Sequence, residues 1–219
     1  MQLGLSADEV LCTTRAVRKR LDLERDVEQS VLDECLQLAL QAPSGSNSQR
    51  WHFVFVKDAD KRAQIAAWYK AAFDAYANSP QSPRNLHGDD PKMAATQERV
   101  LSSADYLSAN MHKVPVFLIP CIEGRLETMG AGNQGMLAGA YGSILPAVWS
   151  FMLAARERGL GTCWTTLHLS REQDTAELLG IPYEQVTQVA LIPVAYTIGT
   201  DFKPAPRKPM DDVRHIDAW

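Results

Sequence analysis

Apolar residues recur along the chain in two different periods, which divide it into predicted helices and strands. Between residues 27 and 41 they return every three or four positions, the spacing of one buried helix face. Asp26 is a suitable N-cap for this helix, with Gln29 three residues on. Residues 51–57 are instead rich in aromatic and β-branched side chains, which favours a strand. The pattern therefore predicts a chain that mixes both element types.

The same periodicity predicts several further helices. They are expected over residues 6–13, 59–77, 92–110 and 143–158, and from Ser170 to Leu179. Ser170 and Gln173 have the spacing of a capping box, and Gly159 and Gly180 follow the ends of the last two helices. The helix over 143–158 is apolar on most of its faces, so we expect it in the core or in a subunit interface.

Further strands and loops complete the predicted fold. Strands are expected over residues 114–122, about 162–167 and 185–198. The first of these is almost continuously apolar, as in a buried strand, but Pro115 and Pro120 favour a place at a sheet edge or at the strand ends. Residues 78–91 and 124–142 are predicted loops, and 200–219 an extended tail. This order predicts an α+β sandwich with a mixed, mostly antiparallel sheet.

Composition narrows the classes of protein that fit. The 219 residues are 46% hydrophobic and 22% charged, which suits a sizeable core, and we expect one domain over 1–219. The net charge of −4 argues against a nucleic-acid partner, and the apolar runs are shorter than a membrane helix needs. No signal peptide is recognisable, so a cytoplasmic protein is expected. Reduced, mostly buried thiols are expected at Cys12, Cys35, Cys121 and Cys163.

Several familiar catalytic patterns receive little support. Gly130 to Gly135 formally match a dinucleotide fingerprint, but the preceding strand ends too early and a flexible loop is favoured. No nucleophile elbow is present. The histidines form no metal-ligand spacing, so no metal site is predicted. They are His52, His87, His112, His168 and His215.

The polar segment from Ala42 to Trp51 joins a predicted helix to a predicted strand. Pro43 cannot continue the helix, and Gly45 permits backbone geometry closed to other residues. The segment also gathers the polar side chains of Ser44, Ser46, Asn47 and Gln49. Such a loop suits a flat polar ligand, and it equally suits an ordinary polar connection.

Two basic clusters lie near opposite ends of the chain. Residues 15–20 hold four cations in six positions, and Arg207 and Lys208 lie in the predicted tail. Charge runs are commonly solvated surface, yet folding could bring both clusters around one dianion. Arginine offers fork-shaped, charge-assisted donors that suit a phosphate. A phosphate-bearing cofactor is therefore a reasonable hypothesis.

Four segments in register resemble the FMN-dependent nitroreductase family. They are Thr-Thr-Arg-Ala-Val-Arg at 13–18, the polar segment at 42–51, Gly-Leu-Gly-Thr-Cys-Trp-Thr-Thr at 159–166, and Arg-Lys-Pro at 207–209 before Val213. The resemblance runs in order over nearly the whole chain. It implies a three-layer α+β fold, with a mostly antiparallel sheet between helices, built as an intertwined homodimer that carries FMN at each end of the interface.

The resemblance also implies which residues hold the cofactor. Arg15 and Arg18 would bind the phosphate and ribityl chain, and Arg207 with Lys208 would complete the phosphate site. The flavin ring would be lined by Pro43, Ser44 and Gly45, held at its polar edge by Asn47, and contacted by Trp164, Thr165 and Thr166. Departures from the family pattern are Ala16 at a common serine position, Ser46 and Arg50.

The chemistry implied by the resemblance belongs to the flavin. NAD(P)H would reduce FMN by hydride transfer to N5, and a small acceptor such as a nitroaromatic or quinone would then take the electrons. No catalytic side chain is required. Alternatives are reductive dehalogenation, ring desaturation, a slow flavin sensor or store, and a non-flavin binding protein. The aromatic run of Trp68, Tyr69, Phe73 and Tyr76 could stack on the flavin or pack in the core.

Overall fold

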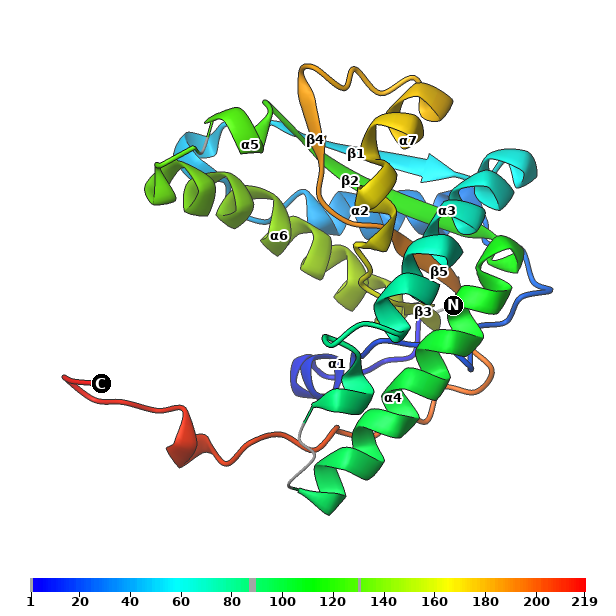
Figure 1. Ribbon diagram of the computed structural model, residues 1–219, viewed down its shortest axis with the longest axis vertical. Coiled ribbons are helices and arrows are strands. Elements are labelled where there is room, and N and C mark those ends of the chain that lie inside the picture. The colour runs from blue at the N-terminus through cyan, green and yellow to red at the C-terminus, as the bar shows by residue number, and fades with distance from the viewer. Residues whose placement is uncertain (1, 87–89, 130) are drawn as a thin grey trace.

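The described strands form a five-stranded sheet between two layers of helices (Figure 1). The computed structural model describes residues 2–86, 90–129 and 131–219; His87, Gly130 and Met1 lie outside them. The strands are β1 (Trp51–Val56), β2 (Val116–Glu123), β3 (Leu160–Thr162), β4 (Val186–Gln188) and β5 (Ile192–Tyr196). Their order is β1-β2-β5-β3, β4 pairs with β2 beside β5, and every ladder is antiparallel. The predicted α+β class is confirmed.

The described helices lie close to their predicted positions, with two exceptions treated below. They are α1 (Ala7–Thr13), α2 (Gln29–Ala39), α3 (Ala59–Ala77), α4 (Pro91–Asn110), α5 (Leu126–Met129), α6 (Gln134–Glu157) and α7 (Glu172–Leu179). Short 3₁₀ turns are η1 (Gly45–Asn47), η2 (Pro83–Asn85), η3 (Met111–Lys113), η4 (Leu167–Arg171) and η5 (Met210–Asp212).

Alternate residues of β2 supply the two halves of the core. Val116, Leu118 and Ile122 pack toward α2 and α6, whereas Phe117 and Ile119 pack toward α3 and α4. Successive side chains of a strand point to opposite faces, so a strand covered on both sides must be apolar at every position. The continuous apolar run in the sequence is the consequence of this central place.

Of the two places predicted for the prolines, the strand end is correct for Pro115, which directly precedes β2, and the sheet edge is wrong. The strand pairs with β1 on one side and with β5 and β4 on the other. Glu123 N–H donates to Arg50 on the β1 side, so by alternation the ring nitrogen of Pro120 faces the other side. On that side, Pro120 lies between the residues that pair with β5 and the residues that pair with β4. Neither ladder therefore needs a hydrogen bond from an N–H at this position. A proline is thus accommodated in a central strand.

The predicted loop over 124–142 is also wrong, because it contains α5 and the first third of α6. Asn133 caps α6 by accepting a hydrogen bond from Met136 N–H at 3.0 Å. Three glycines of this region lie within the helix. Their low helix propensity is the reason why the sequence favours a loop here. Among the described helices, α6 is the one with the length and apolar composition of a membrane span, and 33% of that apolar window is buried. Core and interface helices share this composition.

Smaller differences concern helix caps and strand ends. Glu28 rather than Asp26 occupies the N-cap of α2, and no side chain caps it. The capping box expected at Ser170 does not form, because its hydroxyl donates to the Leu167 carbonyl within η4. The strand expected at about 162–167 begins at Leu160 and ends at Thr162. Gly180, in the left-handed region at φ 71°, ends α7 as predicted.

The basic segment 15–20 lies along β3, at the end of the sheet. Val17 N–H donates to the Thr162 carbonyl at 2.8 Å, and Ala16 forms a parallel bridge to the same residue. Gly161 allows this approach: a Cβ there would lie 2.7 Å from Thr197 Cγ2 and 2.9 Å from Val17 Cγ1. The absence of a side chain at Gly161 therefore allows the basic segment to lie beside the sheet.

The thiols and the tail agree with the sequence analysis. Cys35, Cys121 and Cys163 are buried, Cys12 is exposed, and all four are unpaired. Residues 200–219 form an extended tail that leaves the body of the chain (Figure 1). It carries large exposed apolar side chains, among them Ile216 and Trp219.

Candidate functional site

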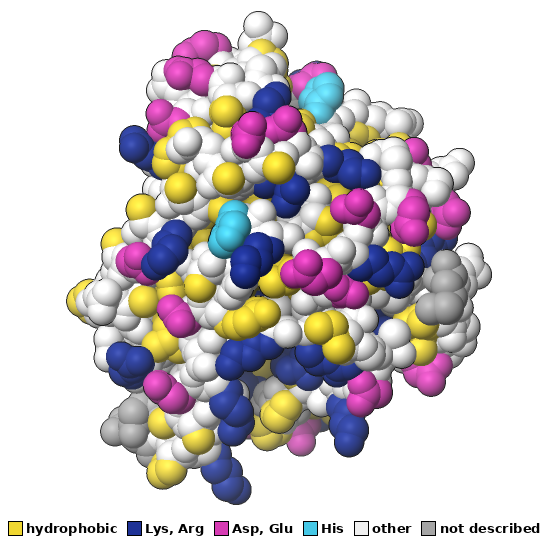
Figure 2. Space-filling view, turned by 90° about the vertical axis from the view of Figure 1, so that its right-hand side faces the viewer, with side chains coloured by type: hydrophobic (Ala, Val, Ile, Leu, Met, Phe, Trp, Pro, Cys, Tyr) yellow, Lys and Arg dark blue, Asp and Glu magenta, His cyan; other side chains and the backbone are white. Residues whose placement is uncertain are grey.

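A cavity of about 410 Å³ lies between the basic segment, α4 and the beginning of the tail. Its walls contain Arg15, Ala16, Val17, Arg18, Lys19, Arg20, Thr96, Arg99, Val100, Ser103, Phe202 and Pro206. Figure 2 shows Lys and Arg side chains gathered in the lower part of the face that α4 helps to form. In a chain of net charge −4, this cavity is a local concentration of positive charge.

Arg20 connects the basic segment to the beginning of the tail. It donates from Nε to the Ile198 carbonyl at 2.9 Å, pairs with Asp201 at 2.6 Å, and lies 4.2 Å over the Phe202 ring. Arg156 of α6 covers the same ring and donates to the Thr200 carbonyl at 3.0 Å. Arg20 is thereby neutralised and serves to hold the cavity wall in place.

Three other cations of the segment have no carboxylate partner among the described residues. Arg15 donates to the Lys203 carbonyl at 3.3 Å, Arg18 to Ser103 Oγ at 3.3 Å, and Lys19 to Ser102 Oγ at 2.9 Å. Neutral partners leave the positive charge uncompensated and most of the guanidinium donors free. The arrangement can therefore bind an anion, and it fits a phosphate in particular.

The predicted tail residues lie beside this cavity. Pro206 lines it, which puts Arg207 at its border. Arg207 and Lys208 are exposed, and Arg207 donates to the carbonyl of its neighbour Pro206 at 2.9 Å. The departure at Ala16 leaves a methyl group in the wall where a hydroxyl would donate.

The polar loop is held on α6 in unusual backbone geometry. Gly45 N–H donates to Ser143 Oγ at 2.9 Å. Ser46, Asn47 and Gln49 all have positive φ, between 49° and 53°. Non-glycine residues rarely occupy this region, and three within four positions is a strained arrangement of the kind found at binding sites. The loop is therefore a good candidate for function, as the sequence analysis suggested.

One chain does not bring the two predicted halves of the site together. The loop contacts α6 at Ser143, whereas the region before the basic segment contacts it at Arg156, which donates to Thr13 Oγ1. These two anchors are thirteen positions apart along α6, which corresponds to about 20 Å of helix. In Figure 1, η1 follows α2 and lies near the N-terminal end of α6, and α1 lies near its other end.

Residues 164–166 lie shortly after β3, which the basic segment adjoins through the bridge between Ala16 and Thr162. Thr165 is buried and pairs with Leu191, its hydroxyl donating to that carbonyl at 2.6 Å. Burial raises the pKa of the adjacent Cys163 thiol, and the nearby Arg18 guanidinium opposes part of the rise. Thr166 lines a separate cavity with Trp68 of α3. These residues therefore can contribute to a ligand site together with Arg15 and Arg18.

The aromatic run on α3 divides between core and surface. Tyr69 and Phe73 are buried in the core with β2 residues, so for these two the packing interpretation is correct. Trp68 is partly exposed and faces the cavity that Thr166 lines. Of the four aromatic rings, Trp68 is the one that lines this cavity, so the run does not form a stacking wall.

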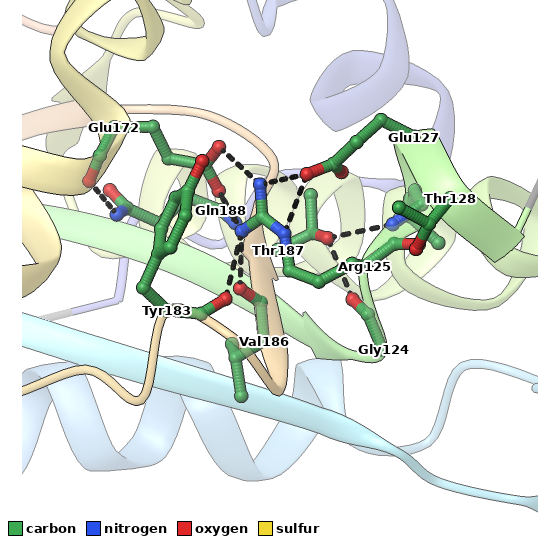
Figure 3. A network of polar contacts seen from close by, with 10 residues as sticks. Gly124, Arg125, Glu127, Thr128, Glu172, Tyr183, Val186, Thr187 and Gln188 are labelled. Carbon is green, nitrogen blue, oxygen red and sulfur yellow. Dashed lines mark hydrogen bonds and ion pairs between the residues drawn. The ribbon is translucent and has the colours of Figure 1, made fainter.

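A buried ionic network was not predicted from the sequence (Figure 3). Arg125, with 9% of its side chain exposed, pairs with Glu127 and at 2.9 Å with Glu172, and donates to the Val186 carbonyl. Glu172 also accepts from Gln188 N–H at 2.9 Å. The network joins the end of β2 to α7 and β4. Its members are 47 and 61 residues apart along the chain, so local patterns give no signal for it.

His168 in η4 is fully buried next to this network, and neither ring nitrogen has a hydrogen-bond partner among the described residues. Burial lowers its pKa from 6.5 to about 4, while Gln188 partly opposes the shift. The folded chain therefore keeps this imidazole neutral, whereas the unfolded chain takes up a proton as the pH falls through 6.5.

We expect acidification to destabilise the fold through His168. Between pH 6.5 and pH 4 the unfolded state binds the additional proton, so the free energy of unfolding should fall by on the order of 3 kcal/mol. Urea unfolding at pH 7.5 and pH 4.5 measures the fall. His168→Leu should lose part of this pH dependence; an equal dependence in both proteins would assign the effect to other groups.

Comparisons with known proteins concern the family and the fold of the chain. The sequence model of the nitroreductase family matches residues 13–196. A protein of Methanothermobacter thermautotrophicus, provisionally named NADH dehydrogenase/NAD(P)H nitroreductase, is 23% identical over 214 residues, which cover 96% of this chain and 86% of that protein.

Two solved structures show the same fold. A BluB-like flavoprotein from Clostridium difficile 630 superposes with a TM-score of 0.69 at 18% identity, covering 97% of this chain and 99% of that one. Iodotyrosine deiodinase bound to FMN and 3-iodo-L-tyrosine gives 0.67 at 22% identity, covering 92% and 95%. At these identities the likeness concerns the fold, and it confirms the predicted architecture.

Proposed function

The chain belongs to the nitroreductase family and is accordingly an FMN-dependent oxidoreductase, and from this premise we propose how it holds its cofactor and what it reduces. We assign NAD(P)H as the electron donor and a nitroaromatic, quinone or related small molecule as the acceptor. The observation that carries this proposal is the cavity of about 410 Å³ lined by Arg15 and Arg18, whose charges no carboxylate among the described residues neutralises.

The donor set fits the phosphate of FMN. Arg15 and Arg18 line the cavity, and Arg207 directly follows Pro206, which also lines it. A phosphate monoester carries close to two negative charges at neutral pH and accepts hydrogen bonds at three terminal oxygens, which planar guanidinium groups match. Residues 164–166 lie shortly after β3, which the basic segment adjoins at Thr162, and they would contact the flavin ring.

A second copy of the chain completes the ring site. The loop with Pro43, Ser44, Gly45 and Asn47 contacts α6 at Ser143, about 20 Å along the helix from Arg156, which contacts Thr13 just before the basic segment. Helix α6 also presents exposed apolar side chains at Tyr141, Leu145 and Trp149, spaced by four residues. Such a stripe on a long helix suits burial against a partner. We therefore propose a homodimer in which the loop of one chain would lie at the cations of the other.

The protein's part in the reaction is binding and orientation. The chemistry that bound FMN supplies is hydride acceptance from NAD(P)H and reduction of the second substrate. Arg15 and Arg18 would hold the phosphate, Asn47 of the partner copy would hydrogen-bond the polar edge of the ring, and residues 164–166 would contact the ring. The strained loop is held in a fixed shape by Ser143, so its polar groups are oriented before the ligand arrives.

The absorption spectrum of the purified protein tests this proposal. We expect bound FMN, or uptake of added FMN, and bleaching of the flavin absorbance by NADH or NADPH under anaerobic conditions. Addition of menadione or a nitroaromatic should restore the absorbance. A protein that binds no FMN, or a loaded protein that neither nicotinamide reduces, would contradict the proposed function.

A further inference from the structure

We propose that Arg99 of α4 is a third phosphate-binding residue, which completes the cationic cavity from within the same chain. This inference rests on the proposed function, because it takes the phosphate of FMN as the ligand. Neither the basic segments nor the resemblance pointed to α4, so the residue emerges from the fold alone.

Helical spacing places Arg99 in the cavity wall. The α4 residues that line the cavity are Thr96, Arg99, Val100 and Ser103, which lie three, four and seven positions from the first. These spacings form one face of a helix. Two hydrogen bonds hold this region of α4 against the basic segment, from Arg18 to Ser103 and from Lys19 to Ser102. The guanidinium of Arg99 thus faces the same space as those of Arg15 and Arg18.

The charge of Arg99 is available to a ligand. Its Nη2 donates to Thr96 Oγ1 at 2.9 Å, and Thr96 in turn donates to the Lys92 carbonyl. This neutral contact orients the guanidinium one turn back along the helix and leaves four of its five N–H donors without a partner among the described residues. The adjacent Glu98 pairs with Arg84 at 3.5 Å instead.

The cavity therefore surrounds one anion with three guanidinium groups from two elements. Arg15 and Arg18 come from the segment along β3, and Arg99 comes from the helix on its other side. Cations on opposite sides of a dianion hold it in position more firmly, and compensate its charge more fully, than a cluster on one strand. Arg207, by contrast, belongs to the exposed tail and is not among the residues that line the cavity. Arg99 is the better-placed third donor.

Affinity for FMN compared with riboflavin tests the inference, since riboflavin lacks the phosphate. Apoprotein is titrated with each flavin and quenching of flavin fluorescence is followed. Arg99→Ala should weaken FMN binding about tenfold, the effect of losing one charge-assisted contact, and should leave riboflavin affinity unchanged. Arg99→Lys should recover part of the loss.

Lys92→Ala removes an exposed charge from the same helix outside the cavity, and it should bind both flavins like the unaltered protein. Unchanged FMN affinity in Arg99→Ala would overturn the inference, and so would an equal loss for riboflavin, which would indicate a structural role. If the unaltered protein binds no FMN at all, the proposed function fails instead, so the two failures are distinguishable.

Discussion

Removing the side chains of Arg15 and Arg18 together should weaken FMN binding by at least about 100-fold. Each arginine offers a charge-assisted contact worth roughly 1.5–3 kcal/mol, and two such losses correspond to two or more orders of magnitude in affinity. Neither guanidinium is neutralised by a carboxylate among the described residues, so the fold itself loses little. Fluorescence titration of Arg15→Ala with Arg18→Ala against FMN measures the effect.

The control is a double substitution that removes the same charge elsewhere. Lys61→Ala with Lys92→Ala alters two exposed lysines on α3 and α4, outside the cationic cavity. This variant should bind FMN normally. Circular dichroism of both proteins checks that the helices persist, since Arg18 also touches Ser103. If the arginine variant keeps its FMN affinity, the phosphate lies elsewhere, even in a protein that carries flavin.

The cationic segment could be predicted because its charged residues are close together in the sequence. Four cations in six positions are visible in the sequence, as is the resemblance of 13–18 and 159–166 to one family. That these two segments adjoin follows only from the fold, through the bridge between Ala16 and Thr162. The place of Arg99 in the cavity could not be predicted, because a single arginine on a helix gives no signal until its neighbours in space are known.

Helix α6 shows where local propensity misleads. Three glycines and an apparent dinucleotide motif made 124–142 read as a loop, yet the helix begins at Gln134. The helical part of this stretch packs on α5 and on the polar loop, and tertiary packing outweighs the weak helix propensity of glycine. The prediction for Pro120 failed similarly, because the interval between β5 and β4 is a property of the whole sheet.

Placing charges on the exposed face of α6 should convert a dimer into monomers and abolish tight FMN binding at the same time. Leu145 and Trp149 are 36% and 41% exposed on a helix that buries Ile144, Ala147, Val148 and Phe151 completely. Glutamates at both positions would have to be buried without partners in an interface, which costs several kcal/mol. Light scattering after gel filtration measures the mass of Leu145→Glu with Trp149→Glu.

Loss of FMN binding follows from the distance between the two halves of the site. In a monomer, the loop with Asn47 and the basic segment stay at contact points on α6 that are about 20 Å apart, so the ring would lose its contacts with the loop. Leu86→Glu, at another exposed leucine between η2 and α4, should keep both the dimer and the cofactor. A variant that stays dimeric would show that the interface lies elsewhere. A monomer that binds FMN tightly would show that one chain builds the whole site, and the strained loop would then need another explanation.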